Sequence, residues 1–247
     1  MTTVVADLGD VDATARAAAA AGAVDLLVNG AGVGGMKGFL DVDVALFDHL
    51  VSVNCRAPLQ ISQIVARGMM ERGTGGAVVH VSSQSSTQAI RDRCASAAPR
   101  GGRDLLSRIL SAAAATARRR GDPDAAAASR GSVRPPRPNA PSQFDRYSLT
   151  KAGIDYLTKS MALELGHRGI RTNCVNPTVV LTELGRDAWK DPAKAGPMLA
   201  SIPAGRFAEP EDVADAVLYL LSDRAAMVNG LCMPVDGGFL ASRAHLP

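Results

Sequence analysis

Short apolar runs alternate with amphipathic segments along most of this sequence, and this alternation restricts the possible folds more than any other feature. Five runs of three to five residues, bounded by polar residues and glycines, are typical of buried strands. They lie at residues 4–6, 24–28, 77–81, 171–175 and 231–235. Helical patterns separate them, at residues 11–21, about 43–72, 147–165 and 210–222. The alternation predicts an α/β fold whose parallel sheet is covered by helices on both faces, with ligands bound beyond the carboxyl ends of the strands.

Length and composition limit the class of protein further. A chain of 247 residues is long enough for one α/β domain, and its 47% hydrophobic and 21% charged residues are typical of globular proteins. No apolar run approaches the roughly 18 residues of a membrane-spanning helix, and the N-terminus lacks a signal-peptide pattern. The four cysteines are scattered without metal-site spacing, which predicts reduced thiols, a cytoplasmic location and no bound metal.

One segment, residues 93–143, differs in composition from the rest of the chain. It holds ten Arg, no Lys and three Asp, a charge of +7, so the remainder carries 3 − 7 = −4. A mildly acidic body argues against nucleic-acid binding. A segment so rich in Ala, Arg, Gly and Pro packs no core, so we expect a disordered insertion in a single domain spanning residues 1–247. We favour a retained intron or faulty gene model as its origin; a basic interaction loop is the alternative.

Tyr147 and Lys151, at the start of the third helical pattern, give the first indication of chemistry. A spacing of four residues places both side chains on one helix face, one turn apart. The phenol of tyrosine has a reference pKa of about 10, and a neighbouring ammonium lowers it. Such a tyrosine exchanges a proton with a carbonyl or alcohol oxygen near neutral pH. Without further partners, the same pattern also describes a part-buried Tyr and a solvated Lys.

Two polar residues at other positions join this pair. Ser83 follows the predicted strand at 77–81, where a hydroxyl can hydrogen-bond a substrate oxygen, although serines there are usually turn formers. Asn54 lies within the long helical pattern, 29 residues before Ser83, where an Asn otherwise simply faces solvent.

The glycines at positions 30–35 match G-x-G-x-x-G directly after a predicted strand. A dinucleotide fingerprint requires a helix to begin at the third glycine, so that its N–H groups face the pyrophosphate. Here residues 36–40 intervene, and the next helical pattern begins near Asp43. The glycines therefore do not form that fingerprint.

In type and order, Asn54, Ser83, Tyr147 and Lys151 resemble the Asn-Ser-Tyr-Lys tetrad of the short-chain dehydrogenase/reductase family. Residues 29–32 are similar to its Asn-Asn-Ala-Gly motif, with Gly30 in place of the second Asn, and residues 176–182 to its Asn-Pro-Gly loop and following Thr. The resemblance implies a Rossmann-like, doubly wound parallel sheet. It also implies that Tyr is the acid/base and that Ser positions the carbonyl. Lys would lower the pKa of Tyr and bind the nicotinamide ribose, and Asn would hold a proton-relay water.

Further segments resemble a subgroup of these enzymes that reduces small sugars and α-dicarbonyls. This resemblance implies NADP(H), with NAD as the alternative, a small carbonyl or sugar substrate and a homotetramer. The implied cofactor contacts are Asp7, Leu8, Asn29, Ala31, Gly32, Tyr147, Lys151, Pro177, Val180 and Thr182. The implied substrate contacts are Ser83, Gln84 and Trp189.

The sequence departs from the family in two places. Ser83 and Tyr147 are 64 residues apart, and removing the 51 residues of 93–143 restores the family spacing of about 13. The resemblance starts at the family's third strand, so we expect the first two strands and the T-G-x-x-x-G-x-G loop to be missing. Without a neighbour, the strand at 4–6 is expected to be frayed or mispaired.

These observations leave three functions. The first is an NADPH-dependent carbonyl reductase of short-chain type, although the activity of the chain as written is doubtful. The alternative is a non-catalytic truncated paralogue, or a mis-predicted gene model, that acts as a binding or oligomer subunit. A third function, RNA binding through residues 93–143, lacks the aromatic residues on which bases stack.

Overall fold

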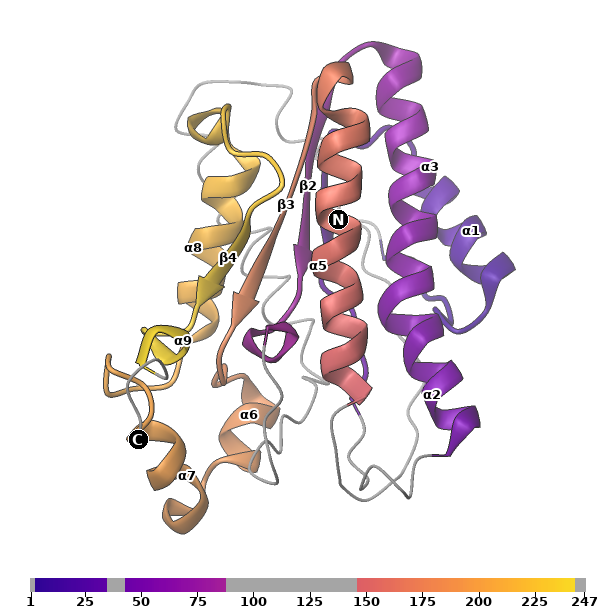
Figure 1. The fold of residues 1–247 in the computed structure, drawn as a ribbon. Coiled ribbons are helices and arrows are strands. Elements are labelled where there is room, and N and C mark those ends of the chain that lie inside the picture. Colours follow the sequence, from indigo (N-terminus) through magenta and orange to yellow (C-terminus); the bar gives the residue numbers. More distant parts are fainter. Residues whose placement is uncertain (1–2, 35–42, 88–145, 243–247) are drawn as a thin grey trace.

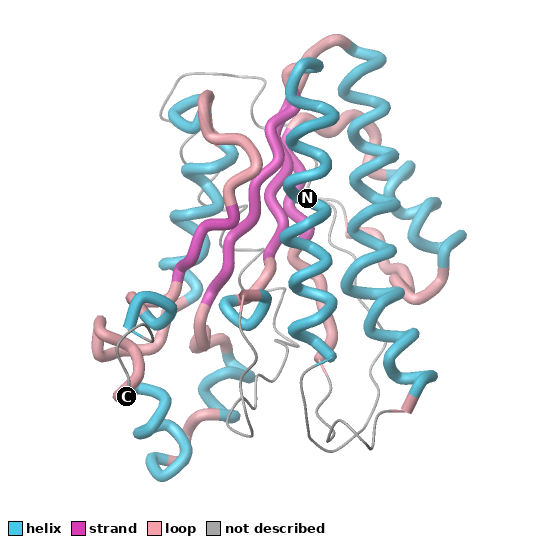
Figure 2. The backbone as a smooth tube through the Cα atoms, in the orientation of Figure 1, coloured by secondary structure: helices cyan, strands magenta, loops and turns pink. Residues whose placement is uncertain are grey.

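The computed structural model describes residues 3–34, 43–87 and 146–242 of the chain. These residues contain one parallel sheet with the strand order β1-β2-β3-β4. The strands are β1 (Leu26–Asn29), β2 (Gly76–Val81), β3 (Ile170–Pro177) and β4 (Cys232–Val235). Figures 1 and 2 show them in the middle of the molecule with helices on either side. The predicted α/β class and parallel sheet are confirmed.

Helices occupy every predicted position. The longer ones are α1 (Val11–Ala20), α2 (Val44–Val51), α3 (Ala57–Arg72), α5 (Arg146–Leu165) and α8 (Pro210–Leu221). Helical structure is continuous over the expected range of about 43–72. Its middle part, η2 (Ser52–Arg56), is π-helical and lies between the α-helices α2 and α3. None of the described helices combines the length and the apolarity needed to cross a membrane.

Alternating side chains of β2 explain how the sheet is covered. Successive residues of a strand point to opposite faces. Ala77 and Val79 pack against α8 in one apolar cluster. Val78, between them, packs in a second cluster with Met69 of α3 and Met161 of α5. Helices α3 and α5 therefore share one face of the sheet, and α8 covers the other (Figure 1).

Residues 4–6 do not form a strand, so the strand predicted there is wrong. The result agrees with the expectation that this segment would be frayed without a neighbouring strand. Side chains, rather than strand pairing, anchor the residues just after it. Leu8 is 2% exposed and packs against Val53 and Ala57. Arg56, the last residue of η2, donates a hydrogen bond to the carbonyl of Gly9. This bond ties the segment before α1 to η2.

Three short helices were not predicted: α6 (Glu183–Ala188), α7 (Pro192–Leu199) and α9 (Phe239–Ser242). Each is eight residues or fewer, too short to show clear periodicity. Local capping signals do mark two of them, because the side chains of Thr182 and Asp191 accept hydrogen bonds at the N-termini of α6 and α7. The expected insertion at 93–143 lies outside the described residues.

Candidate active site

Tyr147 and Lys151 lie in the first two turns of α5, one turn apart, as predicted. Lys151 is 4% exposed, and its Nζ donates a 2.7 Å hydrogen bond to the carbonyl of Val81 at the end of β2. The same Nζ lies 5.1 Å from the centroid of the Tyr147 ring. Lys151 is therefore a buried cation beside the phenol, and the alternative of a solvated lysine is wrong.

Burial determines the protonation of this lysine. Desolvation lowers the pKa of Lys151 from 10.5 to about 8, while the Cys55 thiol and the Asp155 carboxyl act in the opposite direction. At pH 7 the ammonium form therefore still dominates by about tenfold. The site keeps a positive charge next to Tyr147 near neutral pH and loses it in mildly alkaline solution.

Asn54 is 1% exposed and lies in the π-helical segment η2, so the alternative of a solvent-facing Asn is wrong. Its Oδ1 accepts a 2.8 Å hydrogen bond from the N–H of Val33, and its Nδ2 donates to the Val33 carbonyl at 2.8 Å. The Nδ2 also donates to Oγ1 of Thr150 at 3.0 Å. Asn54 thus joins the loop after β1 to α5. Local π-helical segments of this kind are frequent at functional sites.

The loop after β1 passes close to the same residues. A Cβ atom on Gly32 would lie 3.4 Å from Oδ1 of Asn54 and 3.5 Å from Nζ of Lys151. The structure therefore brings Gly32, Asn54 and Lys151 together at the carboxyl end of the sheet, as the strand topology predicts.

Ser83 lies two residues beyond β2, next to the short helix η3 (Gln84–Ser86). Its Oγ accepts hydrogen bonds from the N–H and the hydroxyl of Ser85, at 3.2 and 3.0 Å. Ser82, the residue before it, donates to the carbonyl of Lys151 at 3.1 Å. This contact holds the start of the serine loop against α5.

Asp155, which we did not predict, organises the buried side of this loop. The side-chain nitrogen of Asn176, at the end of β3, donates to the Asp155 carboxylate at 2.9 and 3.1 Å. The same nitrogen donates to the carbonyl of Ser83 at 3.1 Å, and Ser86 donates to Asp155 at 2.6 Å. Asp155 follows Tyr147 and Lys151 at intervals of four, and this spacing on one helix face is the signal that was available.

The remaining predicted residues are spread over the fold. Asn29 is buried at the end of β1 and donates to Ser62 at 2.9 Å, which ties the strand to α3. Leu8 and Ala31 belong to one apolar cluster. Asp7 is exposed, and its carboxylate accepts a 2.8 Å hydrogen bond from the N–H of Gly9.

The loop after β3 holds the last predicted cofactor contacts. Pro177 ends the strand and is buried, and Val180 forms an isolated bridge with Ala208. The hydroxyl of Thr182 accepts a 3.1 Å hydrogen bond from Gly185, so Thr182 has a structural role as the cap of α6.

Trp189, predicted to contact substrate, is 6% exposed and packs in an apolar cluster around α6 and α7. Its ring lies 5.3 Å from that of Phe207, at an interplanar angle of 56°. In this arrangement most of the indole supports the packing of α6 and α7.

Six buried side-chain nitrogen and oxygen atoms have no hydrogen-bond partner among the described residues. Two of them follow the carboxyl ends of β2 and β3, namely Oε1 of Gln84 and Oγ1 of Thr178. Buried polar groups normally have partners, so unpaired ones at the end of a sheet suit a polar ligand. Together with the buried ammonium of Lys151, they fit the nicotinamide half of a dinucleotide. The loop at 30–34 leads into residues outside the described ranges, and the cofactor contacts implied for Ala31 and Gly32 stay a prediction.

The fold and site define a class of protein, and sequence comparison agrees with it. A family model described as short chain dehydrogenase matches residues 1–118, and one described as Enoyl-(Acyl carrier protein) reductase matches residues 138–240. The chain belongs to the short-chain dehydrogenase/reductase family and is, by family, an NAD(P)-dependent oxidoreductase. Because the first model matches from residue 1, it does not confirm the expectation that two strands are missing.

Individual relatives are similar over nearly the whole chain. L-xylulose reductase from Mesocricetus auratus is 42% identical over 240 residues, which cover 97% of this chain and 78% of the relative. Carbonyl reductase [NADPH] 2 from Sus scrofa is 41% identical over 239 residues, covering 97% and 77%. A proposed NAD(P)-dependent gluconate 5-dehydrogenase from Beutenbergia cavernae, crystallised with NADP at low occupancy, superposes with a TM-score of 0.71. It is 27% identical, and the match covers 96% of this chain and 76% of that one.

Proposed function

We propose that this protein is an NADPH-dependent carbonyl reductase acting on small sugars or α-dicarbonyls. The observation that carries the proposal is the position of Lys151, buried with its Nζ 5.1 Å from the centroid of the Tyr147 ring. A buried ammonium beside a phenol suits proton transfer to a carbonyl oxygen. The relatives named as L-xylulose reductase and carbonyl reductase [NADPH] support the substrate class and NADP over NAD.

When bound, the nicotinamide supplies hydride to the carbonyl carbon, and the protein supplies position and a proton. Tyr147 protonates the developing alkoxide, and the hydroxyl of Ser83 orients the carbonyl oxygen. Lys151 places its ammonium beside the phenol and would hold the nicotinamide ribose. Asn54, fixed by Val33 and Thr150, keeps the loop after β1 against α5 and would hold the proton-relay water.

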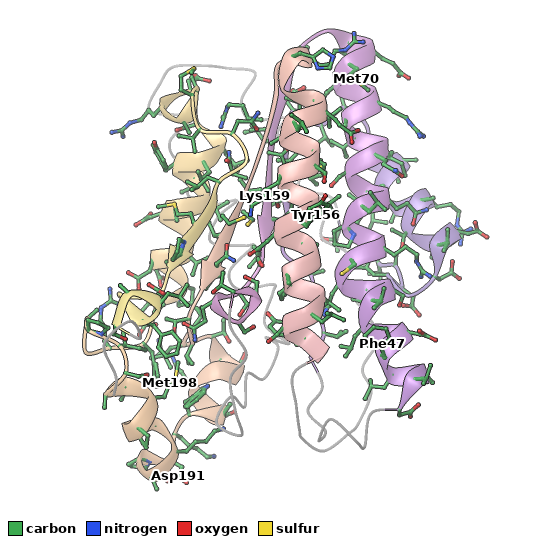
Figure 3. All side chains as sticks on the ribbon, viewed as in Figure 1. Phe47, Met70, Tyr156, Lys159, Asp191 and Met198 are labelled. Carbon is green, nitrogen blue, oxygen red and sulfur yellow. The ribbon has the colours of Figure 1, made fainter. Side chains whose placement is uncertain are left out.

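The test is NADPH oxidation followed with L-xylulose and with diacetyl as substrates. The Tyr147→Phe variant should lose about 10²–10⁴-fold in kcat, the usual effect of removing a general acid. Tyr156→Phe is a matched control, because Tyr156 lies on the same helix but is 75% exposed (Figure 3). Equal loss in the two variants, or full activity in Tyr147→Phe, would contradict the assignment of Tyr147.

A second candidate function is that of a non-catalytic subunit, which would bind other copies through the exposed face of α5. Leu149, Tyr156 and Leu163 are 60%, 75% and 84% exposed and recur every seven residues. They form one apolar stripe on the helix, as expected of a surface that meets another copy. A catalytic homotetramer and an inactive subunit both use such a stripe. A spliced transcript that continues upstream into a strand, a T-G-x-x-x-G-x-G segment and a helix would favour the enzyme.

The same transcript tests the origin of residues 93–143. The two matching family models leave out only residues 119–137 of this segment, and the bounds 93–143 stay a prediction. A mature message that encodes all 51 residues, 93 to 143, would exclude a retained intron.

A further inference from the structure

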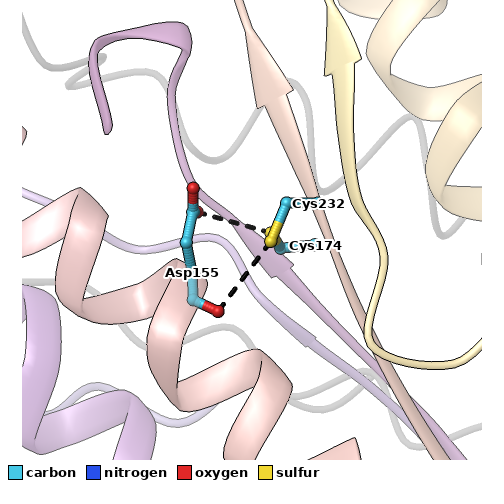
Figure 4. A group of neighbouring side chains, drawn as sticks. All are labelled: Asp155, Cys174 and Cys232. Atoms are coloured by element: carbon cyan, nitrogen blue, oxygen red, sulfur yellow. Dashed lines mark hydrogen bonds between the residues drawn. The ribbon is translucent and has the colours of Figure 1, made fainter. Parts of the chain in front are cut away.

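Two cysteines face each other on neighbouring strands behind the candidate active site. Cys174 of β3 and Cys232 of β4 are direct register partners in the parallel sheet. Their sulfur atoms and a carboxylate oxygen of Asp155 all lie within 4.8 Å of one another (Figure 4). Neighbouring strands are about 4.8 Å apart, and disulfides join Cα atoms that are about 4.4–6.8 Å apart. The backbone is therefore close enough for a bond between the two sulfurs.

The two thiols differ in accessibility and in charge. Cys174 is fully buried, whereas Cys232 is partly exposed. The neighbouring Cys174 thiol lowers the pKa of Cys232, and the ammonium of Lys159 acts in the same direction. The neighbouring Cys232 thiol, together with burial, raises the pKa of Cys174. Cys232 is therefore the more acidic and the more accessible thiol of the pair.

The surroundings favour a bond between the sulfurs over a shared metal ion. Asp155 is the third potential ligand, but Asn176 and Ser86 already donate hydrogen bonds to its two oxygens. Both oxygens of the carboxylate therefore already accept hydrogen bonds. A metal ion would have to displace these buried donors, whereas a disulfide needs only the two sulfurs.

We propose that Cys174 and Cys232 form a reversible disulfide when the protein meets a peroxide. The Cys232 thiolate attacks hydrogen peroxide, giving a sulfenic acid and hydroxide. The sulfur of Cys174 then attacks the sulfenic sulfur, its proton leaves with the displaced hydroxyl as water, and the disulfide forms. The two electrons lost by the thiols reduce the peroxide. A small-molecule dithiol reverses the reaction by thiol–disulfide exchange.

The disulfide would act next to the residues that hold Ser83. The thiol of Cys174 donates to Oδ1 of Asn176 at 3.3 Å, and the nitrogen of the same amide donates to the carbonyl of Ser83. Oxidation removes this donor from the buried network at the end of β3. The oxidised protein should therefore hold the serine loop less tightly than the reduced protein, which links its redox state to the candidate site.

The experiment uses the full chain and does not depend on catalysis. The protein is treated with hydrogen peroxide, its remaining thiols are alkylated, and intact mass and non-reduced peptide maps are recorded. We expect two fewer alkyl groups than in untreated protein alkylated under the same denaturing conditions, and a linked peptide pair containing Cys174 and Cys232, both reversed by dithiothreitol. Cys232→Ser and Cys174→Ser should each abolish the link. Cys55→Ser is the matched control, a partly exposed thiol that should leave it intact.

Three outcomes would overturn the proposal. One is oxidation of Cys232 to a sulfinic acid without a linked peptide. Another is a disulfide that pairs either cysteine with Cys55 or Cys94. The third is stoichiometric binding of added Zn²⁺ that protects both thiols and is lost in Asp155→Asn, which would make the cluster a metal site.

Discussion

The side chain of Lys151 reaches back from α5 and donates a 2.7 Å hydrogen bond to the carbonyl of Val81, the last residue of β2. The two residues are 70 positions apart in the chain. The bond fixes the ammonium between Tyr147 and β2, the strand that leads to Ser83. One charged hydrogen bond therefore holds α5 against the end of this strand. Hydrogen bonds of this charge-assisted kind are stronger than neutral ones. The hydrogen bond therefore offsets part of the free energy that burying the Lys151 ammonium costs.

The pKa of Lys151 predicts how the reaction depends on pH. Lys151 is protonated when the pH lies below its pKa of about 8, and the charge beside Tyr147 is lost when the pH lies above it. The rate of carbonyl reduction should therefore fall as the pH rises through about 8. Profiles of kcat/KM against pH would show this fall in the wild type. In Lys151→Arg, whose guanidinium stays protonated, any residual activity should lack it. A wild-type profile that stays flat between about pH 7 and 9 would contradict the prediction.

Asn176→Ala should destabilise the fold strongly. Asn176 is 1% exposed, and its side-chain nitrogen donates to Ser83, Ser86 and Asp155. Its loss leaves the buried Asp155 carboxylate short of donors, at a cost of about 2–4 kcal/mol in the free energy of unfolding. Urea denaturation measures this change. Thr74→Ala removes only two long contacts of an exposed hydroxyl, 3.4 Å to Asp25 and 3.2 Å to the Gly75 carbonyl, and should stay within about 0.5 kcal/mol of the wild type. Similar values for the two variants would refute the role given to Asn176.

The apolar stripe of α5 should hold copies of the chain together. Leu163 is 84% exposed, so Leu163→Glu should leave the monomer folded while it places a charge in the contact. Size-exclusion chromatography with light scattering should show an oligomer for the wild type and a smaller species for the variant. Val5→Glu, at a residue 71% exposed and outside α5, is the control and should not change the mass. A monomeric wild type would overturn the prediction.

Where the sequence predicted the structure well, the signal was local. Strand ends at 81 and helix starts at 11 and 210 agree with the structure because periodicity and capping depend on near neighbours. The pairing of Tyr147 with Lys151 on one face followed from the same periodicity. The segment at 4–6 was predicted as a strand and is not one, because a strand also needs a neighbour that periodicity cannot supply.

The sequence by itself determined the order of strands and helices, the family, and the four residue types of the candidate tetrad. Only the tertiary structure decided that Asn54 is buried by a π-helical turn, that Trp189 packs in a core, and that Asp155 meets Asn176. These contacts join residues from different elements, and the bond from Asn54 to Thr150 spans 96 positions. Helical and strand periodicity report only which face a side chain occupies. The partner on that face is fixed by how the helices and strands pack on one sheet.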